Sequence, residues 1–162
     1  MIGQMSILLR LKTLKEEQAL RALQVKRRQV AEGEAVLDEA RQAVSASAAT
    51  LGSREDAIYE GILGRVVDLG ALDDTRGAVV ALEKGHARLT DSAERAAYTL
   101  HRLTGECEAA AEGHRAATRV RDKYTILRDD LAARAAEEAE AREEGEVEEL
   151  FGRRRPGPGE RP

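Results

Sequence analysis

The sequence has very little of what builds a compact globular core. It contains no tryptophan, aromatic side chains make up only 2% of its 162 residues, and 35% of the residues are charged. The 42% counted as hydrophobic includes many alanines, which favour helix but bury little area. This composition favours a long, thin helical protein over a compact domain with an internal pocket.

The sequence also lacks the signals of export and of membrane insertion. Its single cysteine, Cys107, excludes an internal disulfide and makes a reducing compartment the default expectation. The opening residues have no basic segment of a signal peptide, and no run approaches the roughly 18 apolar residues of a membrane span. We therefore expect a soluble protein that is not exported by a signal peptide and does not insert into a membrane.

A basic, aromatic-rich surface for nucleic acid is missing as well. The formal net charge is -4, whereas phosphate binding needs a basic face. The basic clusters at residues 26–28 and 153–155 are interpreted as a solvated helix face and a solvated tail. No nucleic-acid partner is expected.

Catalytic and metal-binding patterns are equally scarce. The histidines, His86, His101 and His114, are 15 and 13 residues apart, whereas a helical metal site needs ligands about four residues apart on one face. Neither glycine-rich phosphate-binding motif occurs, and carboxylates on a solvated helix have no pocket to separate their pKa values. The sequence predicts a protein that is not an enzyme and holds neither metal nor cofactor.

What the chain does have is a coiled-coil pattern. Large apolar residues recur every seven positions in its first half, at Leu23, Val30, Leu37, Val44, Leu51 and Ile58. Such a series in constant phase indicates one stripe of a continuous helix that packs against a facing helix.

The facing helix is encoded later in the same chain. Slots alternating by three and four run through Val79, Leu82, His86, Leu89, Ala93, Ala96, Leu100, Leu103, Cys107, Ala110, His114 and Ala117. Between these two halves lie closely spaced glycines, together with aspartates suited to start a helix. The pattern predicts an all-α fold, a long antiparallel two-helix coiled-coil hairpin with a disordered C-terminal tail.

The predicted hairpin occupies residues 1–151. Helix one is expected at about 6–63, the turn at about 64–73 and helix two at about 74–149, with residues 152–162 as the disordered tail. Helix one could restart at Ser53, which begins a capping box, but a continuous helix is preferred because Leu51 and Ile58 keep one phase.

In both helices the apolar series changes phase near the termini. The early series Ile7, Leu11 and Leu14 is out of phase with Leu23, and the later series continues after Ala117 as Val120, Tyr124, Leu127 and Leu131. We expect the two irregularities to lie opposite each other and to mark a paired change of supercoil.

Two regions hold more apolar residues than the seam uses. The turn region is one, and its excess is interpreted either as an exposed interface or as a small plug that closes the hairpin. The other is the end with both termini, where Ile7, Leu8, Leu9, Leu11 and Leu14 would face Tyr124, Leu127 and Leu131, interleaved with basic residues.

Three segments resemble a known family. The segments at residues 8–19 (LLRLKTLKEEQA), 59–69 (YEGILGRVVDL) and the late Lys123-Tyr124 with the Glu-rich ending resemble the YscO/SctO family of type III secretion, relatives of flagellar FliJ. The likeness covers nearly the whole chain up to about residue 151. The interior glycines Gly33, Gly52 and Gly113 differ from what the family implies, because they would soften a rigid shaft.

The resemblance implies a non-catalytic stalk or adaptor in the bacterial cytoplasm, at the cytoplasmic face of the secretion apparatus. The end with both termini would bind a hexameric secretion ATPase through Leu8, Arg10, Leu11, Lys12, Lys15, Tyr124, Leu127, Arg128 and Leu131. The turn would bind the export-gate ring protein through Tyr59, Ile62, Leu63, Val66, Val67, Leu69 and Leu72.

Two other functions stay open at this point. The chain could be an escort protein that binds translocator chaperones, which some members of the family also bind, or a generic coiled-coil tether. A tether would form two parallel long helices per dimer, whereas the hairpin is expected to be a monomer.

Overall fold

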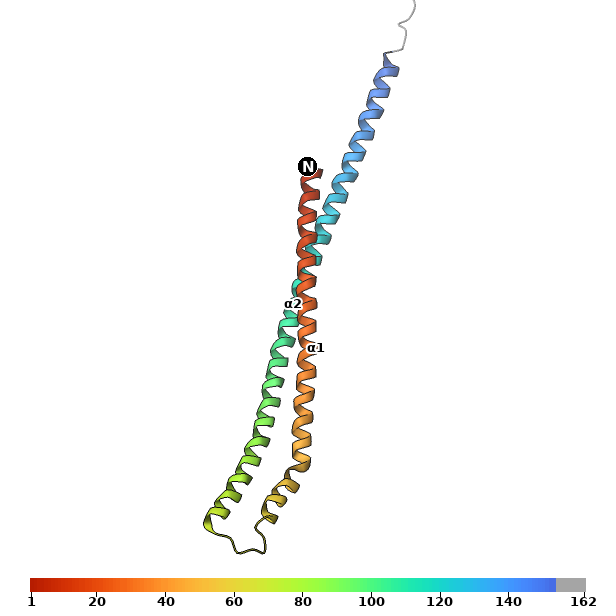
Figure 1. The fold of residues 1–162 in the computed structure, drawn as a ribbon. Coiled ribbons are helices and arrows are strands. Elements are labelled where there is room, and N and C mark those ends of the chain that lie inside the picture. The colour runs from red at the N-terminus through yellow and green to blue at the C-terminus, as the bar shows by residue number, and fades with distance from the viewer. Residues whose placement is uncertain (154–162) are drawn as a thin grey trace, which may run out of the picture. The chain divides into compact units, whose positions relative to one another are not determined.

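The structure, a computed structural model, describes residues 1–153 as two long helices. α1 spans Ile2–Glu60 and α2 spans Leu69–Gly152, and the chain reverses direction between them (Figure 1). The predicted all-α hairpin is therefore confirmed. The predicted disordered tail lies outside the described residues from position 154 onward.

The chain divides into two units, each made from both helices. One unit comprises residues 21–112 and includes the turn, and the other comprises residues 1–20 and 113–162.

In the unit of residues 21–112, the predicted seam holds the helices together. Leu23, Leu37 and Val79 are the buried hydrophobic residues, and the other members of both predicted series are half-buried. No described side chain is less than 2% exposed, because a seam between only two helices leaves every side chain near water. The coiled-coil prediction is confirmed in this unit.

Small and polar residues fill the slots between the large ones. Gly33 lies so close to α2 that an added Cβ would be 3.3 Å from Leu103 Cδ1. Ser47 is buried, and its Oγ lies 2.9 Å from His86 Nδ1. Lys26 reaches across the seam and donates to Glu106 Oε2 at 2.8 Å. Polar contacts therefore join the helices where apolar area is scarce.

Asp68 fixes the start of α2. Its Oδ1 accepts a hydrogen bond from the Ala71 backbone N–H at 2.7 Å, which is N-cap geometry. Gly64 has a φ of +72°, a conformation that favours glycine, in the turn that follows α1. The bounds predicted at about 6–63 for helix one, 64–73 for the turn and 74–149 for helix two differ from the observed ones by three to five residues. α2 begins earlier than predicted because Asp68 rather than Asp73 caps it.

The glycines inside the helices do not interrupt them. α1 continues through Gly33 and Gly52, and α2 through Gly113, so the preferred continuous helix one is confirmed. α1 does change direction in its last turns, drawn in gold in Figure 1. A bend in that segment fits the Gly52-Ser53 pair, because Gly/Ser pairs are common sites of helix kinks.

In the other unit, residues 1–20 pack against α2 from about residue 113. α2 is half-buried at intervals as far as Leu131, and every described residue from 132 onward is exposed. α2 thus continues past the start of α1 as a single helix (Figure 1).

Candidate functional site

The seam of the unit of residues 1–20 and 113–162 differs from the predicted one. The half-buried residues of α1 in its seam slots are Met5, Leu9, Lys12, Glu16 and Ala19, and those of α2 are His114, Ala117, Arg121, Tyr124, Arg128 and Leu131. Both series alternate by three and four, in the phase of the seam in the other unit. The predicted loss of phase near the termini is therefore wrong.

Charged residues in seam slots explain that error. Lys12, Glu16, Arg121 and Arg128 occupy positions that are apolar in most coiled coils. The apolar residues of the expected early series, Ile7, Leu11 and Leu14, are 63%, 50% and 46% exposed. The hydrophobic pattern at this end therefore marks an outer face of α1 and not its contact with α2.

Glu16 is the centre of a polar cluster in this seam. Its side chain is only 14% exposed, and its Oε2 accepts a hydrogen bond from Arg121 Nη1 at 2.7 Å. Its Oε1 lies 3.3 Å from Thr118 Oγ1, whose single proton is shared between this carboxylate and the His114 backbone carbonyl at 3.0 Å. The same Oε1 lies 3.7 Å from His114 Nε2, which is too far for a hydrogen bond. The cluster satisfies the Glu16 carboxylate from α2.

Arg121 is also held by its neighbour in sequence. Its Nη2 donates to Asp122 Oδ1 at 2.7 Å. That hydrogen bond and the negative charges of Asp122 and Glu16 raise the pKa of Arg121 above its ordinary value. The guanidinium therefore stays charged, and it bridges the two helices.

Lys12 and Tyr124 form the next layer of the same seam. Lys12 Nζ lies 5.3 Å from the centroid of the Tyr124 ring, within the range of a cation–π contact. Both residues belong to the predicted ATPase-binding set, and the structure uses both of them to join the helices.

One side of this two-helix unit is apolar and basic. In an antiparallel coiled coil, g positions of the two helices flank the seam on one side and e positions on the other. With the seam residues of each helix as a and d of the heptad abcdefg, Leu8 and Lys15 are g positions of α1. Val120 and Leu127 are g positions of α2. All four side chains are exposed, so they line one shared side.

The opposite side carries small hydroxyl residues. Thr13, Thr118 and Thr125 are half-buried e positions. Each hydroxyl donates to the backbone carbonyl four residues earlier, at 2.9 to 3.1 Å. Beside the first turns of α1, exposed apolar residues therefore gather on the g side and on the neighbouring outer face of α1.

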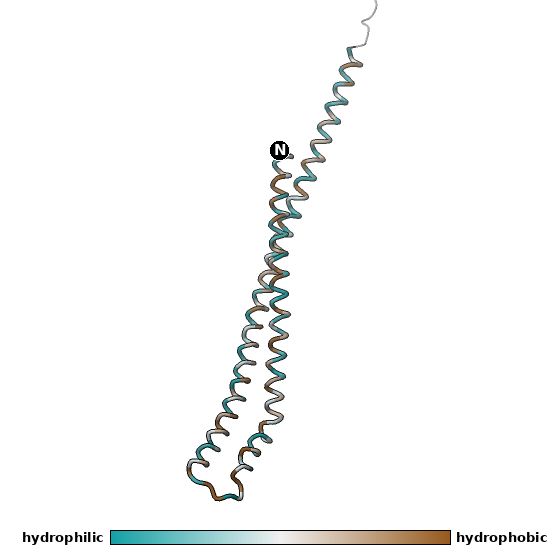
Figure 2. Tube along the Cα trace, in the orientation of Figure 1, coloured by the Kyte–Doolittle hydropathy of each residue, from teal (hydrophilic) through white to brown (hydrophobic). Residues whose placement is uncertain are grey.

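We name the apolar and basic surface of this unit the terminal face. It consists of exposed residues at the g positions and on the outer side of α1, namely Ile7, Leu8, Arg10, Leu11, Leu14, Lys15, Val120 and Leu127. Figure 2 shows apolar residues along the first turns of α1.

The terminal face includes part of the predicted ATPase-binding set. Leu8, Arg10, Leu11, Lys15 and Leu127 are exposed on it. The remaining members, Lys12, Tyr124, Arg128 and Leu131, are half-buried seam residues, and Arg128 also pairs with Asp129 at 2.7 Å.

Sequence reasoning left out several residues of this end. The apolar pattern of the sequence places Ile7, Leu14 and Val120 in the seam and gives no signal for Glu16. A single signal could have corrected this, because Met5, Leu9 and Ala19 continue the phase of Leu23.

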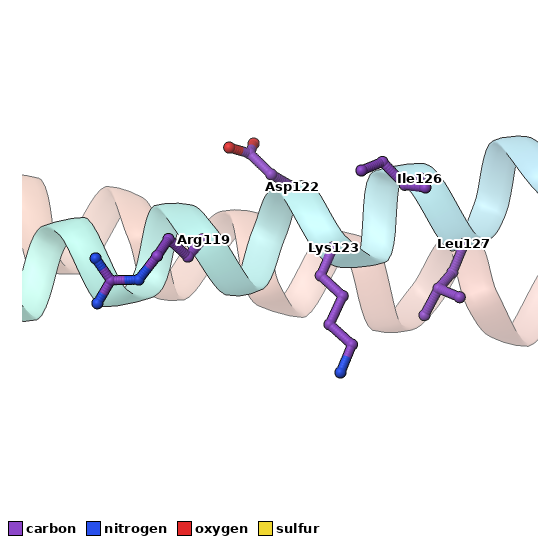
Figure 3. A pocket seen from close by; sticks show the side chains of 5 residues that line it. All are labelled: Arg119, Asp122, Lys123, Ile126 and Leu127. Carbon is purple, nitrogen blue, oxygen red and sulfur yellow. The ribbon is translucent and has the colours of Figure 1, made fainter.

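A shallow surface depression lies on α2 beside the terminal face. Arg119, Asp122, Lys123, Ile126 and Leu127 line it. In Figure 3, Lys123 and Leu127 project to one side of α2, and Asp122 and Ile126 project to the other. The depression is an open helix surface with two apolar side chains between charged ones.

The turn forms a second exposed apolar surface, in the unit of residues 21–112. Of the predicted export-gate set, Val66 is fully exposed, Leu63 and Leu69 are 68% and 79% exposed, and only Ile62 is half-buried. The other members, Tyr59, Val67 and Leu72, are each about two-fifths exposed. Because most of these side chains face water, the interpretation of the turn as a closed plug loses its support.

Within residues 1–153, no group of three or more His, Cys, Asp or Glu side chains is placed to hold a metal ion. No helix in that range has the length and apolar character to cross a membrane.

Comparisons with known proteins agree with this architecture. The family model described as "Type III secretion protein YscO" matches residues 5–153. Among solved structures, the chain is similar to the 2.8 Å crystal structure of type III secretion protein YscO from Vibrio parahaemolyticus. The TM-score is 0.86 and the sequence identity 21%, with 91% of this chain and 93% of that chain covered. At this identity the match shows a shared fold. No curated protein matches the sequence.

Proposed function

Because the chain belongs to the YscO family of type III secretion proteins, we propose that it is a stalk or adaptor that docks on the hexameric export ATPase through the terminal face. The resemblance seen in the sequence is thereby confirmed, and with it a role in the secretion system. The docking partner and the docking residues are the proposal.

The observation that carries this proposal is the exposed apolar stripe of α1. Ile7, Leu11 and Leu14 lie on the outer face while the charged residues Lys12 and Glu16 occupy the seam. Exposed apolar side chains in one contiguous surface mark an interaction site more often than an accident of folding. Docking would bury the half of each side chain that now faces water.

The basic residues of the terminal face favour an acidic partner surface. Residues 1–15 contain Arg10, Lys12 and Lys15 and no Asp or Glu. Opposite charges around an apolar centre speed association and reject wrong partners. The ATPase surface that receives this end is therefore proposed to be apolar with an acidic rim.

The turn is proposed to bind the export-gate ring protein. Leu63, Val66 and Leu69 are its most exposed large apolar residues, and they lie in the unit that does not carry the terminal face. In this arrangement the protein acts at the cytoplasmic face of the secretion apparatus and links two of its components.

The ATPase proposal is tested by substitution on the terminal face. Leu11→Glu and Leu14→Glu are each expected to weaken binding to the hexameric ATPase at least tenfold, measured by biolayer interferometry, because each places a carboxylate in an apolar contact. Gln24→Glu is the matched control, since Gln24 is exposed on the same helix but lies in the unit that does not carry the terminal face, and it should bind as wild type does. Circular dichroism would verify that all three variants keep their helix content.

Equal losses for Leu11→Glu and Gln24→Glu would show a nonspecific charge effect and remove the docking face from the proposal. Tight binding of wild type to a translocator chaperone, with no binding to the ATPase, would favour the escort function instead. The turn is tested with Val66→Ser, which should weaken binding to the cytoplasmic part of the gate protein and leave ATPase binding unchanged.

A further inference from the structure

The apolar seam alone does not define how far α1 is shifted along α2. Large residues recur in α1 every seven positions, and α2 offers apolar slots in the same repeat. A shift of one heptad, about 10 Å, would set Leu51 against Leu89 in place of Leu82 and keep comparable apolar pairs. Small slots such as Ala93 and Ala96 add no steric barrier to that shift.

The polar cluster at Glu16 does not define the register either. α2 carries its partners twice, seven residues apart, as Thr118 and Arg121 and again as Thr125 and Arg128. Glu16 contacts the first pair. A shift of one heptad would bring the second pair to the same carboxylate.

The turn has capping residues for both registers. Asp68 caps α2 in the observed structure. A one-heptad shift moves the centre of the turn by three or four residues, which brings the pair Asp73-Asp74 close to the position of the N-cap. The caps of α2 and the partners of Glu16 are thus available in both arrangements, and of the polar contacts at the terminal end only that of Lys12 with the Tyr124 ring would be lost.

Ser47 and His86, in contrast, can contact each other in only one of the two registers. The Ser47 hydroxyl is buried, accepts from Arg54 Nη2 at 3.3 Å and lies 2.9 Å from His86 Nδ1. Because Arg54 donates to the hydroxyl oxygen, the hydroxyl proton is free to be donated to Nδ1. After a shift of one heptad, Ser47 would face Ala93 or Val79, and neither side chain offers a polar atom.

We propose that Ser47 and His86 are positioning residues that select one of two registers of the hairpin. A single polar pair in a coiled-coil seam can set the register at some expense of stability. The contact between Lys26 and Glu106 supports the same choice, but its two side chains are 33% and 35% exposed and the lysine side chain is flexible. In the shifted register Leu63 would leave the turn and join α1, so the pair also decides which apolar residues the turn exposes.

The test measures the register directly and needs no partner. Spin labels at Ala49 and Thr99, both exposed, would be introduced into a Cys107→Ser background and their separation measured by double electron–electron resonance. The present register places the two labels about 22 Å apart along the helix axis, and the shifted one about 12 Å. Wild type should give one distance.

The double variant Ser47→Ala/His86→Ala should show a second, shorter distance, with helix content unchanged by circular dichroism. The single variant His86→Asn, made with Ser47 in place, should give one distance as wild type does, because its amide oxygen can accept the Ser47 proton. Adding Thr125→Val and Arg128→Leu to the double variant should remove the shorter distance, because the second set of Glu16 partners is then lost.

A single unchanged distance in Ser47→Ala/His86→Ala would overturn the proposal, and so would two distances in wild type. Failure of His86→Asn to give one distance would show that the hydrogen bond is not the selecting contact. These outcomes do not depend on ATPase binding, so they leave the proposed function to its own test.

Discussion

Leu37 and Val36 offer a direct measure of how much the seam stabilises this fold. They are neighbours in α1, but Leu37 is 7% exposed in the seam and Val36 is 56% exposed beside it. Leu37→Ala removes three buried carbon atoms, which at about 0.8 kcal/mol each is a loss of about 2.4 kcal/mol. The value should lie at the low end of large-to-small substitutions, because an open seam leaves little enclosed cavity.

Val36→Ala should change the free energy of unfolding by less than about 0.5 kcal/mol. It removes area that is mostly in water already, and alanine is the better helix former. Equilibrium urea unfolding followed by circular dichroism measures both. With a slope of about 2 kcal/mol/M, the midpoint of Leu37→Ala should fall by about 1 M.

Comparable losses for the two variants would refute the reasoning, since they would show that position in the seam does not govern stability. A loss below about 0.5 kcal/mol for Leu37→Ala would show that the seam is not the main source of stability in this unit.

Three further predictions concern other contacts. Hydrogen bonds from Lys26 and Arg102 lower the pKa of Glu106, so their stabilisation is present above the ordinary value of 4.5 and is lost as the pH falls through the lowered one. In urea unfolding, the difference between Glu106→Gln and wild type should therefore be full at pH 7 and shrink steadily as the pH falls below 4.5. Gly105→Ala should raise the free energy of unfolding by about 1 kcal/mol, because an added Cβ at that position meets nothing within 4 Å. Gly33→Ala should raise it clearly less, because the Cβ would crowd α2. Equal gains for the two variants would contradict the close approach of the helices at Gly33. Asp68→Ala should cost about 1 kcal/mol through loss of the N-cap and Asp68→Asn much less, as thermal unfolding would show.

The fold could be predicted wherever apolar residues occupy the seam. The interval of seven from Leu23 to Ile58 identified the buried stripe of α1, because hydrophobic periodicity reports the face that leaves water. At the terminal end the same reasoning identified the wrong stripe. There Lys12 and Glu16 replace apolar seam residues, so the strongest apolar pattern belongs to a face left open to water.

Helix ends were predictable only to within a few residues. The sequence offers aspartates at 68, 73 and 74 as caps for α2, and each satisfies the local chemistry of an N-cap. Local chemistry could not choose among them, because the register of the two helices decides which one stands at the turn. In the observed structure that choice agrees with the contact between Ser47 and His86.

Because no seam side chain is fully buried, a destabilising substitution should act only over a short distance along the helices. Each layer of side chains touches only the layers before and after it, so stability is assembled along one dimension, much as in repeat proteins. Hydrogen exchange should therefore reveal a gradient along each helix in place of one protected nucleus. A substitution such as Leu37→Ala should speed exchange within its own and adjacent heptads and leave distant amides unaffected.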